Sequence, residues 1–189
     1  MMNVSLSLLR QIVISPGVLA GGGIIIFALY LFKSGTNFLD VKKVFKDYFS
    51  IFSKAKIHIA FFWGLPFIFA LALIQETILT AELSESLLVF LSIFISALFA
   101  MLAILVQKQE HNLDTAYQRI LIETASVALF EIILCVFSLL VTVSMIFIGQ
   151  SCADWLAMIS SFLDYYLIFA ILINILILVK RLKALIDNP

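Results

Sequence analysis

The feature that most constrains this chain is a pair of long apolar segments, residues 124–149 and 155–179, joined by a short polar link. Each segment has 25 or 26 residues. As a helix with a rise of 1.5 Å per residue, each would be roughly 38 Å long, enough to cross a bilayer. The link at 150–154 is long enough only for a tight turn. The pattern therefore predicts a transmembrane helical hairpin.

Each arm of this hairpin contains one acidic residue, Glu131 in the first and Asp164 in the second. A carboxylate at the centre of a membrane helix costs about 2.5–3.5 kcal/mol on insertion scales, so such residues normally face protein or water. Counted from the ends of their segments, the two acids are expected within about one helical turn of each other in depth, near mid-membrane. We therefore expect an intramembrane polar pair that faces other helices.

Small and polar residues recur around the two acids at helical spacing. Ser138, Thr142, Ser160 and Asn174 could all hydrogen-bond to the pair, and neither arm contains a basic residue. Helix contacts inside membranes use such small and polar positions. Two interpretations stay open: the pair relays protons or cations, or it has a structural or gating role with at least one carboxyl neutral and hydrogen-bonded.

The composition agrees with a membrane protein. The chain is 63% hydrophobic and 13% charged, with a mean hydropathy of +1.17, whereas soluble domains are about half apolar and a quarter charged. Further apolar segments at 11–32, 57–75 and 87–106 bring the predicted number of spans to five. The first of them is borderline in length, and a re-entrant first segment would leave four spans. The predicted fold is all-α, a polytopic transmembrane helical bundle that forms a single membrane domain.

Small residues four positions apart predict close helix packing on two of these segments. They are Gly17 and Gly21 in the first segment, and Ser92 and Ser96 in the third. Such spacing lets helix backbones approach closely in a membrane. It does not say whether the contact is within one chain or between copies.

Residues 37–52 have a different pattern, that of a basic amphipathic helix. Apolar side chains, including either Tyr48 or Phe49, fall on one face, and the other face carries Lys42, Lys43 and Lys46. A helix of this kind is expected to lie on the membrane surface. Its lysines could dock a cytosolic partner or contact anionic lipid, or the helix could simply anchor the chain between spans.

The basic residues predict the topology. Eleven of the twelve Lys and Arg lie after the first span, in the polar connector 107–123 or in the C-terminal tail, and the turns at 76–86 and 150–154 have none. Basic segments of a multi-pass protein stay in the cytoplasm. We therefore expect an inner (plasma) membrane protein with the connector, the surface helix and the C-terminus on the cytoplasmic side.

Enzymatic motifs are absent from the sequence. It contains no Gly-x-Ser-x-Gly, no His-Glu-x-x-His and no phosphate-binding glycine loop. The two cysteines and two histidines lack the spacing of a metal site. The basic patch is small and attached to a membrane surface, which argues against direct nucleic-acid binding. We expect a non-enzymatic protein without metal or cofactor.

Two segments carry a resemblance to a known class of proteins: the basic linker VKKVFKDYFSIFSKAK at 41–56 and the apolar span LVFLSIFISALFAMLAILV at 88–106. With the small size and the near-absence of outer domains, they resemble the small membrane proteins encoded beside cytosolic partners in bacterial anti-phage systems, in particular the membrane subunit of the Kiwa system. This resemblance implies a homo-oligomeric sensor or scaffold that couples membrane disturbance to a cytosolic effector. An ion-conducting pore that depolarises the membrane is the alternative.

Overall fold

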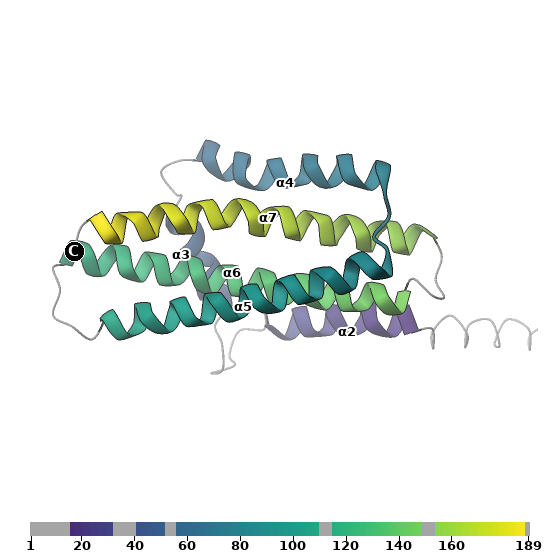
Figure 1. The fold of residues 1–189 in the computed structure, drawn as a ribbon, viewed down its shortest axis with the longest axis horizontal. Helices are drawn as coiled ribbons and strands as arrows, with labels where there is room; N and C mark the ends of the chain where they lie inside the picture. Colours follow the sequence, from purple (N-terminus) through teal and green to yellow (C-terminus); the bar gives the residue numbers. More distant parts are fainter. Residues whose placement is uncertain (1–15, 32–40, 52–55, 110–114, 149–153, 188–189) are drawn as a thin grey trace, which may run out of the picture.

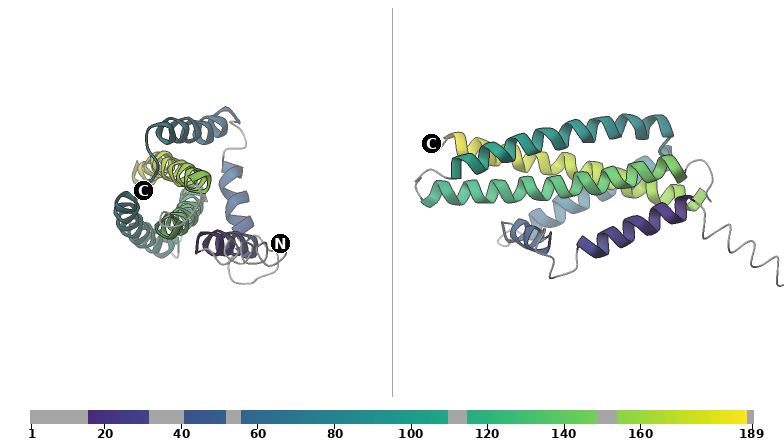
Figure 2. Two further views of the ribbon diagram at one scale, coloured as in Figure 1. Left: turned by 90° about the vertical axis from the view of Figure 1, so that its right-hand side faces the viewer. Right: turned by 90° about the horizontal axis from the view of Figure 1, so that it is seen from below.

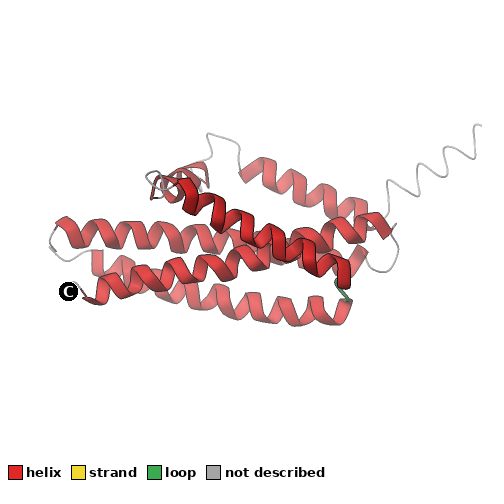
Figure 3. Ribbon diagram, turned by 90° about the horizontal axis from the view of Figure 1, so that it is seen from above, coloured by secondary structure: helices red, strands yellow, loops and turns green. Residues whose placement is uncertain are grey.

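The computed structural model describes most of the chain, namely residues 16–31, 41–51, 56–109, 115–148 and 154–187. Within these ranges every residue is helical except those of the loop at 77–80, as Figure 3 shows. The prediction of an all-α fold is therefore confirmed for the described part of the chain.

The described residues form helices that differ greatly in length: α2 Pro16–Leu31, α3 Val41–Ile51, α4 Lys56–Glu76, α5 Ala81–Gln109, α6 Thr115–Ile148 and α7 Asp154–Asp187. Three of them, α5, α6 and α7, are long and apolar enough to cross a membrane, and α4 contributes the shorter apolar stretch Ala60–Glu76. The predicted spans 87–106 and 155–179 lie within α5 and α7. The predicted span 124–149 lies within α6 as far as Ile148, and residue 149 is outside the described ranges. Part of the first predicted span lies outside the described residues.

Helix α6 is the centre of the bundle. It packs against α5, α7, α2 and α3, while α4 lies on the far side of α7 (Figure 1). Of the most apolar stretch of α6, 61% is buried, compared with 17% for α5. Since α5 contacts α6 along one side only, most of its surface faces outward.

The burial of α6 is complete around its middle. All six residues from Phe130 to Cys135 are buried. Because an α-helix has 3.6 residues per turn, six consecutive buried residues cover every side of it. The core around this stretch includes Leu91 and Leu98 of α5 together with Ile171 of α7.

Helix α3 runs across the bundle and not along it, as the left panel of Figure 2 shows. It packs on α6. Its Val41 and Tyr48 are buried, and its exposed side chains include Lys42, Lys43 and Lys46. The helix expected at 37–52 is described from Val41 to Ile51, and the residues flanking it lie outside the described ranges.

Part of the predicted polar connector at 107–123 is helical in the structure. Helix α5 continues to Gln109, and α6 already begins at Thr115. The sequence between Thr115 and Glu123 has no glycine or proline to end a helix, and Arg119 pairs with Glu123 one turn later at 3.0 Å. Such i,i+4 ion pairs support a helix beyond its apolar part.

Two neighbouring residues of α5 test the α5–α6 contact. Leu91 is fully buried, whereas Ile93 is 67% exposed. We expect Leu91→Ala to leave a cavity and to lower the free energy of unfolding by about 2–5 kcal/mol. Ile93→Ala, its matched control, should leave it nearly unchanged. Thermal unfolding in detergent measures both, and equal losses would show that α5 does not pack on α6 through Leu91.

Candidate functional site

The carboxylate of Asp164 on α7 is bound by two hydroxyl groups of α6. Ser138 donates a hydrogen bond to Oδ1 at 3.0 Å, and Thr142 lies 3.0 Å from Oδ1 and 2.8 Å from Oδ2. Asp164, Ser138 and Thr142 are each fully buried. Because Ser138 and Thr142 are one helical turn apart, they present their hydroxyls on the same face of α6. This contact ties α6 to α7.

The carboxyl group of Glu131 has a different environment. Its side chain is 1% exposed, and among the described residues neither Oε1 nor Oε2 has a hydrogen-bond partner. Buried polar atoms in folded proteins almost always have such a partner. Glu131 is therefore the exceptional polar group of the core.

The expected depth of the two acids is wrong. Asp164 lies level with residues 138–142 of α6, which follow Glu131 by 7 to 11 positions and hence by roughly 10–16 Å along the axis. In the predicted arrangement each acid was placed by its distance from the start of its own segment. The two helices are antiparallel, so those distances run from opposite ends of the bundle. The acids occupy separate sites.

At the level of Glu131, three helices meet through Tyr48 of α3. Its ring stacks on Phe130 of α6, with centroids 3.8 Å apart and an interplanar angle of 15°. Its hydroxyl donates a hydrogen bond to Oδ1 of Asn174 on α7. Burial raises the pKa of Tyr48 above its usual value, and Glu131 interacts with it electrostatically. Tyr48 thus remains a neutral donor that joins α3 to the bundle.

The predicted supporting residues are divided between these two sites. Ser138 serves Asp164, but Asn174 binds Tyr48 instead of either acid. Ser160 is only partly buried, whereas the next residue, Ser161, is fully buried and accepts a hydrogen bond from the backbone N–H of Leu79 at 3.1 Å. Successive residues of a helix point about 100° apart, so Ser160 and Ser161 have different surroundings.

Among the described residues, Ser92, Ser96 and Gly21 do not lie in a close contact between helices. Ser92 and Ser96 are exposed, and each donates its hydroxyl to a carbonyl of its own helix four residues earlier. A side chain at Gly21 would meet no atom within 4 Å. Gly17 lies in α2, but its surroundings are not among those that the structure describes. Serine can satisfy its hydroxyl on its own helix, so its presence does not require a neighbouring helix.

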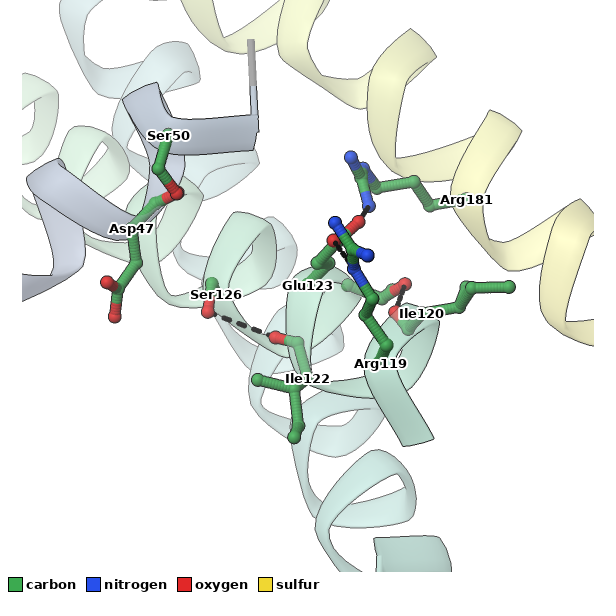
Figure 4. A network of polar contacts seen from close by, with 9 residues as sticks. Asp47, Ser50, Arg119, Ile120, Ile122, Glu123, Ser126 and Arg181 are labelled. Atoms are coloured by element: carbon green, nitrogen blue, oxygen red, sulfur yellow. Dashed lines mark hydrogen bonds and ion pairs between the residues drawn. The ribbon is translucent and has the colours of Figure 1, made fainter. Parts of the chain in front are cut away.

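A polar network lies at the end of the bundle where α5 ends and α6 begins (Figure 4). Glu123 accepts hydrogen bonds from Arg119 at 3.0 Å and from Arg181 of α7 at 2.8 Å. Beside it a cavity of about 370 Å³ separates α6 from α3, whose Asp47 and Ser50 line its other side. The prediction missed the pairing of Glu123 with Arg181, although both residues stand at the edges of their apolar segments.

The two buried acids differ in what they can do chemically. Both carboxylate oxygens of Asp164 accept hydrogen bonds from hydroxyl groups of α6, so this residue links α7 to α6. We call this contact the Asp164 clip. Glu131 has no such donor in the described helices, so its carboxyl oxygens could bind a proton or a cation. Among the described residues, no three His, Cys, Asp or Glu side chains gather in the way that metal ligands do.

Comparisons of the chain with protein-family models, with curated proteins and with solved structures find no match. Function is therefore inferred from the residues and their geometry.

The Asp164 clip can be tested by removing one hydroxyl. Thr142→Val keeps the shape of the side chain but leaves Asp164 with Ser138 as its hydroxyl donor, and we expect a loss of about 1–3 kcal/mol in stability. Ser144→Ala is the matched control, because the Ser144 hydroxyl bonds only to the Leu140 carbonyl of its own helix among the described contacts. Thermal unfolding in detergent compares the two. A Thr142→Val protein as stable as the control would refute the clip.

Proposed function

We propose that this protein is a membrane-embedded sensor or scaffold subunit that couples the state of the membrane to a cytosolic partner through α3. The observation that carries the proposal is the position of Tyr48. This residue belongs to a short helix with exposed lysines, yet its ring is inserted among α6 and α7 and bound to Phe130 and Asn174. A displacement of α3 therefore changes contacts inside the bundle.

The distribution of charge supports a cytoplasmic position for α3. The end of α5, the start of α6 and the end of α7 lie at one end of the bundle (Figure 1). This end carries Lys108, Arg119, Lys180, Arg181 and Lys183, whereas Glu76, Glu82 and Glu85 lie around the opposite α4–α5 turn. The positive-inside rule then orients the basic end and the C-terminus toward the cytoplasm of a cell with an inner membrane.

This orientation is consistent with five crossings. Helices α2 and α4 run alongside the three long helices (Figures 1 and 2), and α4 contains 21 residues, close to the roughly 20 needed to span the apolar layer. Under this topology, α3 lies at the cytoplasmic boundary, between the first and second crossings. Its lysines then face the lipid headgroups or a bound protein.

A helix in this position responds to the membrane. Each Lys near an anionic surface contributes about 1 kcal/mol of attraction, so a change of lipid charge or packing alters how firmly α3 stays docked. The resemblance to membrane subunits of anti-phage systems supports phage-induced membrane disturbance as the stimulus and a cytosolic effector as the partner. The outward small face of α5 around Ser92 and Ser96 suits contact between copies in a homo-oligomer.

The docking role can be tested by charge reversal. Replacing Lys42, Lys43 and Lys46 together by Glu should release a cytosolic partner that co-purifies with the wild-type protein, because acidic side chains repel an acidic docking surface. Replacing the same three residues by Arg keeps the charge and should keep the partner bound. Quantitative mass spectrometry of affinity-purified membranes measures the amount of partner. Retention of the partner by the Glu variant would refute docking through these lysines.

The buried Glu131 favours a second candidate, an ion-conducting pore. Ion flux into liposomes containing the purified protein separates the two functions. For a sensor or scaffold we expect no flux above that of empty liposomes. Flux that is lost in Glu131→Gln but kept in Asp164→Asn would instead establish conduction, because Asp164 is engaged by Ser138 and Thr142.

A further inference from the structure

The surroundings of Glu131 do not compensate the free-energy cost of burying an ionised carboxylate. Burying an ionised carboxylate without a partner costs several kilocalories per mole, even after the protein relaxes around it. Asp164 offsets part of this cost through hydrogen bonds from Ser138 and Thr142. Among the described residues, Glu131 has no donor within hydrogen-bond distance. Such a side chain is stable in the closed bundle only as the neutral acid.

The charges around Glu131 leave this conclusion unchanged. Its titratable neighbours are Tyr48 of α3 and Cys135, one turn further along α6. No Lys or Arg lies on α7 between Asp164 and Lys180, on α5 between Glu85 and Lys108, or anywhere on α2. Arg181 of α7 already binds Glu123. On α3, Lys42, Lys43 and Lys46 are exposed, whereas Glu131 is 1% exposed. In the part of the chain that the structure describes, no cation lies within hydrogen-bond distance of the Glu131 carboxyl group.

The contacts of α3 lie at the same level of the bundle. Tyr48 covers the face of Phe130, the residue immediately before Glu131, and Phe45 approaches the same ring edge-on with centroids 5.0 Å apart. The polar cavity lined by Ser50 and Ser126 ends one turn before Phe130 on α6. The cavity therefore approaches the level of the Tyr48–Phe130 contact.

We propose that Glu131 is a proton-binding site that α3 closes through the contacts of Tyr48 with Phe130 and Asn174. While α3 is docked, the carboxyl group keeps its proton and exchanges it slowly. When α3 is displaced, water reaches the side chain, the O–H bond of the carboxyl breaks, and the proton passes to water to leave a hydrated carboxylate. Redocking of α3 takes one proton back from water. No co-reactant other than water is involved.

Infrared spectroscopy of the purified, reconstituted protein tests this proposal directly. A protonated carboxyl group has a C=O stretching band separate from that of a carboxylate, and the band shifts when the proton is replaced by deuterium. We expect such a band in the wild type at neutral pH, its loss in Glu131→Gln and its retention in Asp164→Asn. After transfer to D₂O the band should shift slowly, because exchange requires opening of the closed state.

Variants of α3 test the closure. Tyr48→Ala should accelerate the deuterium shift by about tenfold or more, the effect of destabilising the closed state by about 1.4 kcal/mol. Ile93→Ala, on α5 and 67% exposed, is the control and should exchange as the wild type does. If Tyr48→Ala does not fold, Phe45→Ala replaces it, since it also removes a ring from Phe130.

Two results would overturn the proposal. Identical spectra for the wild type and Glu131→Gln would show that Glu131 carries no proton. Equal exchange rates in the wild type and in a folded α3 variant would show that α3 does not close the site. Because these measurements use the protein without any partner, either result would leave the docking role of the α3 lysines untouched.

Discussion

The contact between α6 and α7 is the interaction on which the rest of the bundle depends. In an apolar environment no water is present to compensate a lost polar contact, so each buried polar group needs a partner on a neighbouring helix. Asp164 finds two such partners on α6. Once α6 and α7 are held together in this way, α5 packs on one side of the pair and α4 on the other. The cross-running α3 then completes the enclosure of α6.

Much of this fold could be predicted from the sequence. The length and apolar composition of 124–149 and 155–179 predicted two long antiparallel helices, because backbone groups in lipid must be satisfied within the helix. The location of Glu131 and Asp164 in the interior follows from the cost of exposing a carboxyl group to lipid. These predictions depend on local composition, and they required no knowledge of which helices are neighbours.

The parts that could not be predicted depend on rotation and register between helices. Tyr48 and Phe49 are adjacent, and the sequence pattern did not choose between them; in the structure Tyr48 is 1% exposed and Phe49 36%. Asn174 could equally have bonded to an acid, but the crossing of α3 supplies a tyrosine hydroxyl instead. Ser92 and Ser96 satisfy their hydroxyls on α5 itself. The outcomes for Tyr48 and Asn174 are set by tertiary neighbours, whereas those for Ser92 and Ser96 are local to α5.

The polar contacts between α6 and α7 also determine how a signal could travel through the protein. Asp164 is held near one end of the pair, and Glu123 bonds to Arg181 near the other. These two polar contacts lie at different heights along the helix pair. An axial shift of α7 along α6 by one turn would break both contacts at once, so such a shift is strongly disfavoured. A movement of a helix that keeps both contacts intact must be lateral. The short transverse helix, held to the bundle mainly by aromatic rings, is the element mechanically suited to such a swing.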